Sequence, residues 1–480
     1  MTVCGVPWHA ASPTPNHITM NTENNPTATP DRSLIIIGCG PGGYQTAAFA
    51  AANGFNVTIF EKAQPGGTCL NRGCIPTKAY CHVASTLLEQ RKLADLGLTP
   101  SARPSTAISF PAVHAHKEAV VAQLRQGIET LMAAPGITYV KGEARLKDAR
   151  TVECDGHLYA ADNIIIASGS HSAMPPIEGI GNPRVVTSTG LLAMKTLPKR
   201  LAIIGAGVIG MEMASAFAAF GTKVTVIEFM KECLPPMDQD LAKRLRKLLE
   251  KRGVKFHLGA AAKSITETTQ PDPCAQVTFC QKNKELTIEA DTVLVATGRH
   301  PNTEGLGLEA AGVAYDRHGI SVDENLETTA KGIYAIGDVN GRLMLAHAAE
   351  QQGRQVVERL MGKGTATYPS DVPVPSAVFT VPELAGVGPL EAQLKEQGAT
   401  FEVHKSFYRA NGKAVAMDAT DGLVKILTDE GGRIVACHAL GAHAADIVQE
   451  ATALIQLGTT IGDLHHIVHI HPTLGELLVS

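Results

Sequence analysis

The chain has 480 residues, a formal net charge of -4, 44% hydrophobic residues and 18% charged residues, which is typical of a globular protein with several domains. Opposite charges nearly cancel and no long basic run occurs, so nucleic acid and an acidic membrane surface are not expected partners. No run of about 18 uninterrupted apolar residues exists, and we therefore expect no membrane-spanning helix.

The first 31 residues contain no Lys or Arg. A secretory signal needs a positive segment and a mitochondrial transit peptide is Arg-rich, so we expect a cytoplasmic protein. Residues 1–31 are rich in Pro, Asn and Thr without apolar periodicity, which predicts a disordered extension, and Met20 offers an alternative translation start. Ten cysteines are too few for a disulfide-built scaffold.

A glycine-rich turn follows the first apolar run of the chain, residues 34–37. A helix-forming stretch, residues 44–52, comes next, and a second apolar run, residues 57–60, ends at Glu61. A strand, a turn of the form G-x-G-x-x-G, a helix and a second strand that ends in an acid are the pattern of a dinucleotide-binding unit.

Each part of this pattern has a physical task. Gly38 permits the tight turn, Gly40 lets the backbone approach a pyrophosphate, and Gly43 lets helix and strand pack closely. The helix N-terminus stabilises the phosphate charge. Glu61 can accept hydrogen bonds from ribose hydroxyls.

The same unit recurs after the apolar run 201–204, with turn glycines Gly205, Gly207 and Gly210 and a second strand that ends at Glu228. The last glycine and the acid are equally spaced in the two copies, so the sequence predicts two dinucleotide sites. A carboxylate at the ribose repels a 2′-phosphate, and no Arg follows at positions 229 and 230, which favours NAD over NADP. The alternative is an exposed acid at a strand end.

Cys69 and Cys74 are the one candidate cysteine pair, within the run Gly-Gly-Thr-Cys-Leu-Asn-Arg-Gly-Cys-Ile-Pro-Thr-Lys at residues 66–78. A regular helix would separate them by about 7.5 Å along its axis, whereas a disulfide needs Cα atoms within about 7 Å. The backbone must therefore depart from a helix here, and Gly73 makes that plausible. A cytosolic pair beside a dinucleotide unit indicates redox activity rather than a structural bridge.

The chain resembles the flavoprotein disulfide reductases, and within them the dihydrolipoamide dehydrogenases, from about Ser33 to its C-terminus. Besides the cysteine run, the resemblance is carried by the segments 167–170, 296–299, 333–339 and 469–476. It implies an α/β fold with two Rossmann-like dinucleotide-binding domains and a C-terminal α+β dimerisation domain. It also implies that the first unit binds FAD and the second binds NAD.

The resemblance assigns roles near the flavin. Cys69 corresponds to the sulfur that exchanges with the substrate, Cys74 to the sulfur that lies against the flavin, and Asp338 to a contact with the ribityl chain. Lys78 would share a helix face with Cys74 and place a cation near the flavin, although a solvated Lys is the alternative. Further matching positions are Gly169 and Ala346 for FAD, and Gly298 for NAD.

Glu212, two residues after Gly210, matches a family glutamate near the nicotinamide, and the alternative is an acid favoured by the helix dipole. Near the chain end, His471 precedes Pro472, which would be a natural first helical residue. Glu476 would then hold one ring nitrogen of His471 and make the other a better base.

Four histidines close to the chain end, His465, His466, His469 and His471, also suggest a metal site. A helix would align only His465 and His469 closely on one face, and no cysteine lies nearby, so we expect no metal.

The motifs order the chain into an extension (1–31), an FAD-binding domain (32–170), an NAD-binding domain (171–298), a central domain with the second FAD contact (299–371) and a dimerisation domain (372–480). The last of these mixes strand-like runs (423–427, 434–439) with a helical run (445–457). The family resemblance implies a homodimer in which His471 of one subunit reaches the cysteines of the other.

The implied reaction is oxidation of protein-bound dihydrolipoamide with reduction of NAD. The lipoyl group would come from an acyltransferase of a 2-oxoacid dehydrogenase complex or from the glycine cleavage carrier. A glutathione reductase is disfavoured by residues 75–78 and by Glu228, and a mercuric reductase by the lack of a terminal cysteine pair. A flavin-binding partner with little turnover is the alternative from another class. Gly475 and the short ending after Glu476 depart from the family pattern.

Overall fold

A computed structural model of the chain describes residues 32–97, 108–268, 273–363 and 373–479. The predicted extension 1–31 and the alternative start at Met20 lie outside the described residues. Among the helices in these ranges, none is long and apolar enough to cross a membrane.

The first sheet has five parallel strands in the order β20-β7-β1-β2-β3. Their bounds are Ser33–Ile37 (β1), Asn56–Glu61 (β2), Ile137–Lys141 (β3), Asn163–Ile166 (β7) and Ile333–Ala335 (β20). Because both faces of a parallel sheet are covered, its strands need continuous apolar runs. Residues 34–37 are all buried, as that requires.

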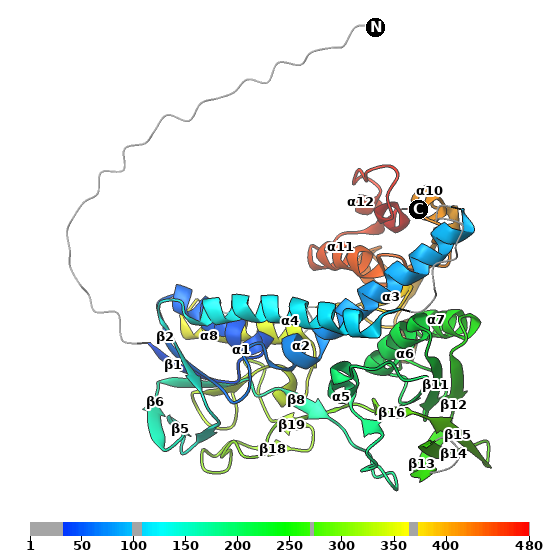
Figure 1. Ribbon diagram of the computed structural model, residues 1–480. Coiled ribbons are helices and arrows are strands. Elements are labelled where there is room, and N and C mark those ends of the chain that lie inside the picture. Colours follow the sequence, from blue (N-terminus) through cyan, green and yellow to red (C-terminus); the bar gives the residue numbers. More distant parts are fainter. Residues whose placement is uncertain (1–31, 98–107, 269–272, 364–372, 480) are drawn as a thin grey trace.

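The two faces of this sheet pack against different layers. Leu34 and Ile36 point to the helices α1 (Pro41–Ala52), α4 (Phe110–Met132) and α8 (Ala346–Leu360), which lie together along one side of the sheet (Figure 1). Ile35 and Ile37 point to a small antiparallel sheet of β4 (Ala144–Leu146), β5 (Thr151–Cys154) and β6 (His157–Ala160). Successive side chains of one strand thus point to opposite faces of the sheet and pack into two different cores.

The second sheet repeats this plan in the order β12-β11-β10-β16-β9. Its parallel strands are β9 (Val185–Val186), β10 (Arg200–Ile204), β11 (Lys223–Glu228), β12 (Lys255–Leu258) and β16 (Thr292–Val295). Helices α6 (Val208–Phe220) and α7 (Gln239–Lys251) cover one face. The antiparallel strands β13 (Ala260–Thr268), β14 (Cys274–Gln281) and β15 (Lys284–Ala290) cover the other.

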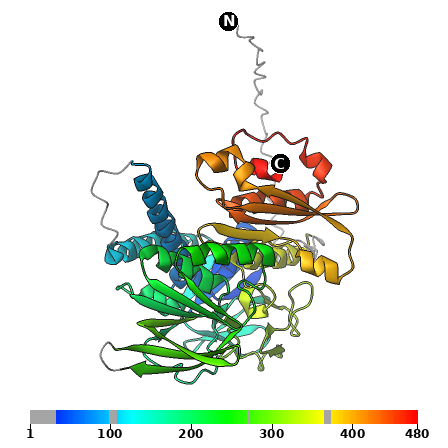
Figure 2. The same ribbon diagram turned by 90° about the vertical axis from the view of Figure 1, so that its right-hand side faces the viewer.

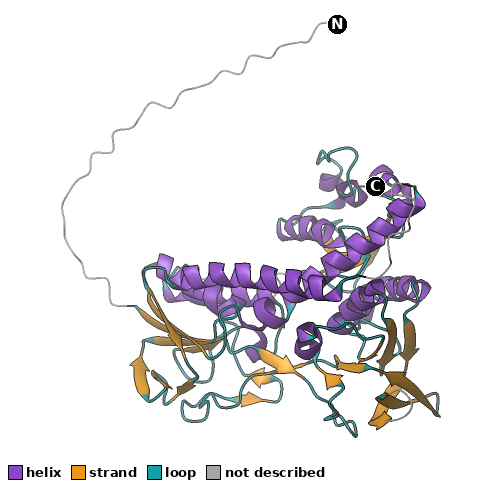
Figure 3. Ribbon diagram, in the orientation of Figure 1, coloured by secondary structure: helices purple, strands orange, loops and turns teal. Residues whose placement is uncertain are grey.

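Short elements lie beside and between the two sheets. Strands β8 (Ser170–Ser172) and β17 (Arg299–Pro301) pair with each other, as do β18 (Tyr315–Asp316) and β19 (Gly319–Ile320). The helices α2 (Gly67–Arg72) and α3 (Cys74–Asp95) follow one another, and α3 packs on both α4 and α6. Figure 3 shows helices gathered above the strands of the two parallel sheets. Helix α5 (Ser188–Ala193) and the 3-10 helix η1 (Gly337–Asn340) are further short elements.

The C-terminal part is an antiparallel sheet in the order β21-β22-β25-β24-β23, which Figure 2 shows above the second sheet. Its strands are β21 (Ser376–Val378), β22 (Glu383–Val387), β23 (Phe401–Phe407), β24 (Leu423–Asp429) and β25 (Ile434–Gly441). Its helices are α9 (Glu391–Glu396), α10 (Gly412–Ala416), α11 (Ala444–Gln456) and α12 (Ile461–Leu464), with 3-10 helices η2 (Tyr408–Ala410) and η3 (Gly475–Leu478). The predicted α/β class with an α+β C-terminal part is confirmed.

Candidate active site

One continuous cavity of about 1760 Å³ touches nearly every feature that the sequence singled out. Its lining includes both glycine-rich turns, both cysteines of the pair, the start of α8 and part of the C-terminal sheet. The turns reach it because parallel strands place their carboxyl ends at one edge, where ligands of such sheets bind.

The first turn is held in the shape that a dinucleotide needs. Gly38 has a φ of 106°, and a Cβ there would collide with the Ala167 carbonyl oxygen. A Cβ on Gly43 would collide with the Gly38 carbonyl oxygen, so helix α1 can approach β1 only with glycine here. The Glu61 carboxylate accepts hydrogen bonds from the backbone N–H of Cys39 at 3.0 Å and of Ala63 at 2.8 Å.

The second turn has the same geometry. Gly205 has a φ of 105°, and a Cβ on Gly210 would collide with the Gly205 carbonyl oxygen. Glu228 is buried and accepts hydrogen bonds from the backbone N–H of Ala206 and, at 2.7 Å, of Met230. The hydrogen bonds of the second unit therefore match those of the first, as the predicted duplication requires.

The cavity has room where phosphates would approach. A Cβ added at Gly207, Gly169 or Gly298 would meet no atom within 4 Å, and one added at Gly40 would meet its nearest atom at 3.9 Å. Backbone N–H groups at the starts of α1 and α6 are thus open to the cavity, which suits the pyrophosphates of two dinucleotides. The residues present fit FAD at the first turn and a nicotinamide nucleotide at the second.

The cysteine pair lies on a break between two helices, as the five-residue spacing predicts. Helix α2 ends at Arg72, Gly73 adopts φ -139° and ψ -107°, and α3 begins at Cys74. The loop is fixed to the first turn, because the Gly66 N–H donates to the Cys39 carbonyl at 2.8 Å. Cys69 and Cys74 are free thiols in the structure.

The two thiols differ in acidity. A hydrogen bond to Cys74 and burial raise the pKa of Cys69. The same hydrogen bond, received from Cys69, outweighs burial at Cys74 and, with the charge of Lys78, lowers the pKa of Cys74 to about 7. Cys74 is therefore the sulfur that carries negative charge near neutral pH.

Lys78 and Glu212 form an ion pair between α3 and α6. The Lys78 ammonium donates to both carboxylate oxygens, at 2.9 and 3.1 Å. Burial lowers the pKa of Lys78, but the charge and hydrogen bonds of Glu212 outweigh it, so that the pKa is raised. Lys78 is thus a paired cation rather than a solvated one, and Glu212 is a buried acid rather than a helix-surface one.

Asp338 lies at the start of η1, on the cavity wall. It accepts a hydrogen bond from the Ser170 hydroxyl at 2.5 Å, and Arg299 Nε donates to that hydroxyl at 2.7 Å. Ala346 also lines the cavity, as the first residue of α8.

His471 contacts the predicted residue Glu476 but does not line the cavity. Its Nδ1 is 2.8 Å from Glu476 Oε1, while 79% of its side chain is exposed. A hydrogen bond from the Thr473 N–H and the contact with His471 lower the pKa of Glu476. One copy of the chain therefore forms the predicted His471–Glu476 pair but does not bring it to the cysteines.

The expectation that Pro472 begins a helix is wrong. The 3-10 helix η3 begins only at Gly475. The Glu476 carboxylate accepts the Thr473 N–H at 2.7 Å and the Thr473 hydroxyl donates to the Ile470 carbonyl at 2.7 Å, so these contacts turn the chain before the helix starts. In the described part of the chain, no three His, Cys, Asp or Glu side chains are placed to hold a metal ion.

Comparison with known proteins agrees with this geometry. Residues 32–353 match the family described as pyridine nucleotide-disulphide oxidoreductase, and residues 374–480 match the dimerisation domain of that family. The chain belongs to the pyridine nucleotide-disulphide oxidoreductases. The resemblance read from the cysteine run is confirmed.

Relatives in this family include curated dihydrolipoyl dehydrogenases. That of Staphylococcus aureus is 39% identical over 456 residues, covering 94% of this chain and 96% of the relative. That of Bacillus subtilis is 38% identical over 463 residues, covering 94% and 95%. Among solved structures, the HOCl-induced flavoprotein disulfide reductase RclA from Escherichia coli is 32% identical with a TM-score of 0.82, covering 93% of this chain and 98% of that one.

Membership makes the protein an FAD-dependent oxidoreductase that uses NAD(H), and gives it a dimerisation domain. The structure also adds residues that the sequence reasoning left without a role. Arg299 and Ser170 stand inside the segments 296–299 and 167–170, so their positions beside Gly298 and Gly169 were the available signal. No signal in the sequence pointed to Phe379. Its backbone N–H donates to Glu212 at 2.9 Å, and its ring centre lies 4.6 Å from the Lys78 nitrogen.

Proposed function

We propose that this oxidoreductase is a dihydrolipoyl dehydrogenase, which oxidises protein-bound dihydrolipoamide and reduces NAD. The observation that carries the proposal is the acidic Cys74 thiol beside Cys69 on a cavity shared with two dinucleotide turns. Relatives named dihydrolipoyl dehydrogenase, at 38 and 39% identity over nearly the whole chain, support this substrate over glutathione disulfide.

FAD is proposed to bind at Gly38, Gly40, Gly43 and Glu61, with further contacts from Lys78, Gly169, Asp338 and Ala346. NAD is proposed to bind at Gly205, Gly207, Gly210, Glu212, Glu228 and Gly298. The buried carboxylate of Glu228 supports NAD over NADP, because it would repel a 2′-phosphate. When bound, the flavin supplies hydride transfer between the cysteine pair and the nicotinamide.

The chain's own residues handle thiols and protons. In the oxidised enzyme Cys69 and Cys74 form a disulfide, and His471 removes a proton from one substrate thiol. The substrate thiolate attacks the Cys69 sulfur, a mixed disulfide forms there, and Cys74 leaves as a thiolate. The second substrate thiol then attacks the substrate sulfur of the mixed disulfide and closes the lipoamide ring. The released Cys69 sulfur takes up the proton that His471 holds, and the proton of the second thiol passes to His471. Two electrons and two protons have then passed to the protein.

Lys78 and Glu212 hold the charge beside the leaving sulfur. The Lys78 ammonium favours the Cys74 thiolate, and Glu212 limits that effect, since its charge raises the pKa of Cys74. Glu476 keeps the His471 ring oriented with its other nitrogen free to accept a proton.

The proposed assembly is a homodimer in which His471 of one subunit serves the cysteine pair of the other. Support comes from the dimerisation domain and from the separation of His471 from the cavity within one chain. The proposed partners are a lipoylated acyltransferase of a 2-oxoacid dehydrogenase complex or the glycine cleavage carrier. The domain limits at residues 170, 298 and 371 and the cytoplasmic location stay predictions.

Steady-state turnover of the purified flavoprotein tests the proposal. We expect fast NAD reduction with dihydrolipoamide, slow NADP reduction, and no turnover of glutathione disulfide with reduced cofactor. Turnover of glutathione disulfide alone would overturn the substrate and leave the fold and the cysteine pair in place. A yellow protein that dihydrolipoamide cannot reduce would support a flavin-binding partner instead.

A further inference from the structure

One wall of the cavity is the segment 229–238, called here the wall segment, which runs from the end of β11 to the start of α7. Phe229, Met230 and residues 235–237 line the cavity beside the second glycine turn. The wall segment is tied to that turn, because the Leu234 N–H donates to the Ala206 carbonyl at 2.9 Å. Its position therefore bears directly on the second dinucleotide site.

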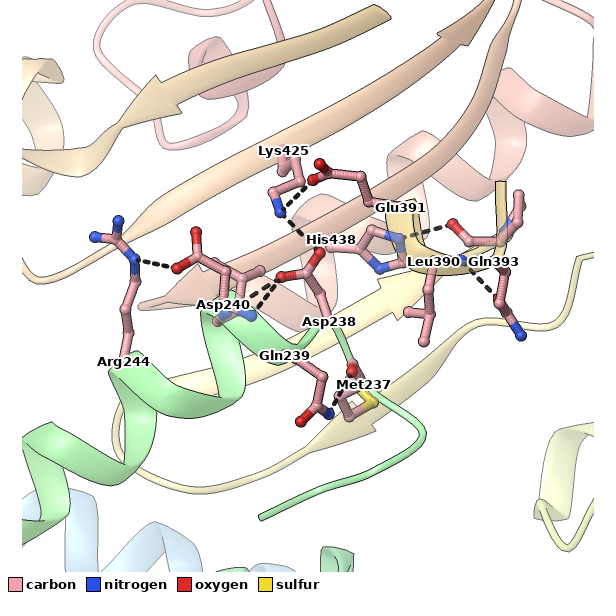
Figure 4. Close-up of polar contacts among 12 residues, drawn as sticks. Met237, Asp238, Gln239, Asp240, Arg244, Leu390, Glu391, Gln393, Lys425 and His438 are labelled. Atoms are coloured by element: carbon pink, nitrogen blue, oxygen red, sulfur yellow. Dashed lines mark hydrogen bonds and ion pairs between the residues drawn. The ribbon is translucent and has the colours of Figure 1, made fainter. Parts of the chain in front are cut away.

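The far end of the wall segment is fixed by Asp238 (Figure 4). One carboxylate oxygen of Asp238 caps α7 by accepting the N–H groups of Asp240 at 3.1 Å and Leu241 at 3.2 Å. The other oxygen accepts a hydrogen bond at 2.8 Å from Lys425, which lies on β24 of the C-terminal sheet. Gln239 closes the segment by donating to the Leu234 and Met237 carbonyls, each at 3.0 Å.

The Lys425–Asp238 contact is a buried ion pair between two parts of the chain. The side chains are 3% and 4% exposed. Lys425 also contacts Glu391 at 3.1 Å, and Glu391 in turn pairs with Lys395, so the charges of the four side chains balance. His438 lies across the strand pair from Lys425 and donates a hydrogen bond to the Pro389 carbonyl at 3.1 Å, and burial lowers its pKa.

The Lys425–Asp238 ion pair contributes more to the relative position of the two segments than to the stability of the fold. A buried ion pair gains little over apolar packing, whereas removal of one partner leaves an uncompensated buried charge. The same pair, however, fixes the start of α7 relative to β24 with a directional contact. A second, weaker contact supports it, since the Ser376 hydroxyl of β21 lies 3.6 Å from the Met237 sulfur.

We propose that Lys425 is a positioning residue for the nicotinamide nucleotide, which acts from the dimerisation domain through Asp238 and the wall segment. This inference rests on the proposed function, since it takes the second turn as the NAD site. It makes NAD affinity depend on a residue that touches neither NAD nor the cysteine pair. Reduction of the enzyme by the dithiol takes place at Cys69 and Cys74, which lie on helices α2 and α3 and not on the wall segment, and it does not depend on Lys425.

The test uses the full-length FAD-loaded enzyme with Lys425→Met, which keeps the length of the side chain and removes its charge. We expect the KM for NAD to rise about tenfold, within the range that side chains remote from a ligand can carry. The kcat, the KM for dihydrolipoamide and the anaerobic rate of flavin reduction by dihydrolipoamide stay at wild-type values. Asp238→Asn keeps an oxygen that can cap α7, and it should raise the KM for NAD by a similar factor.

Arg200→Met is the matched control. Arg200 also contacts two carboxylates, Asp291 at 2.7 Å and Glu289 at 2.8 Å, but it lies at the amino-terminal end of β10 and does not line the cavity. We expect it to lower stability without changing the KM for NAD. The double variant of Lys425 and Asp238 should be no worse than either single variant, because one break already frees the wall segment.

Two results would overturn the inference. One is a wild-type KM for NAD in folded Lys425→Met and Asp238→Asn enzymes, and the other is an equal change in the constants for both substrates, as general loss of structure would give. If Lys425→Met does not fold, the KM for NAD of Asp238→Asn decides whether the inference holds. Failure of the proposed function is distinguishable, since it would appear in the wild-type enzyme as a preference for NADP or for another disulfide.

Discussion

Replacing Glu212 with Gln perturbs the charge balance beside Cys74. Glu212 is 3% exposed and accepts hydrogen bonds from Lys78 and from the Phe379 N–H. Glu212 Oε1 accepts from both donors, so a Gln oxygen in its place can keep both contacts, but the NH₂ group then replaces Oε2 and faces the Lys78 ammonium in place of an acceptor. Loss of one charge-assisted hydrogen bond costs about 1.5–3 kcal/mol.

The expected loss of stability lies at the low end of that range. About a third of the Lys78 side chain, 35%, stays exposed to water, which solvates the ammonium when its partner is lost. We therefore expect Glu212→Gln to lower the free energy of unfolding by about 1.5–2 kcal/mol in urea titrations of the holoenzyme. Glu143→Gln is the control, because the exposed Glu143–Lys62 pair should contribute less than about 1 kcal/mol.

The same variant has a predicted effect on the thiol. The Glu212 charge raises the pKa of Cys74, so its removal should lower that pKa below its value of about 7 and keep the thiolate to lower pH. The measurement is the pH dependence of alkylation at Cys74 in the two-electron-reduced enzyme, followed by mass spectrometry. A Cys74 pKa that rises, or a stability loss no larger than that of Glu143→Gln, would refute the reasoning.

Three further predictions concern the cysteines, the base and the two turns. Cys74→Ser should abolish dihydrolipoamide turnover in a protein that stays yellow, and undiminished turnover would contradict the thiol scheme. Glu476→Gln should lower kcat by about 10²-fold, the scale of a positioned base. The Glu476 carboxylate has a lowered pKa and is ionised at neutral pH, so its removal should change the kcat–pH profile. An unchanged profile would count against the role of Glu476 in orienting His471. Gly210→Ala should collide with the second turn, abolishing NAD reduction while the flavin is still reduced by dihydrolipoamide; Gly43→Ala should instead give a colourless protein, and absorbance spectra distinguish the two.

The two dinucleotide turns could be predicted from the sequence because their determinants are local. Gly38 and Gly205 occupy a backbone conformation that other residues rarely adopt, and Gly43 and Gly210 lie where a Cβ would meet a carbonyl oxygen. These requirements demand glycine at set positions of the turn, and a sequence pattern shows such positions directly. The break between α2 and α3 follows in the same way from the spacing of the cysteines.

Contacts between distant segments could not be predicted in this way. Lys78 and Glu212 were each singled out, but nothing in either motif shows that they pair across 134 positions. Lys425 and Asp238 stand in no motif, and only the packing of the C-terminal sheet on α7 brings them together. Pro472 misled because Pro is favoured at a first helical position, whereas Thr473 and Glu476 form a turn there instead.

The placement of His471 links the proposed catalysis to association of two copies. Val468 and Ile470 are 94% and 79% exposed on the same loop, and neighbouring exposed apolar side chains favour a contact with another protein. His471, one residue further on, is exposed with them. Whatever buries the two apolar side chains must also enclose the imidazole, which shields it from bulk water and sets its distance to a thiol. A second copy of the chain, joined through the dimerisation domain, would do both at once, so loss of the dimer and loss of the base would be a single event.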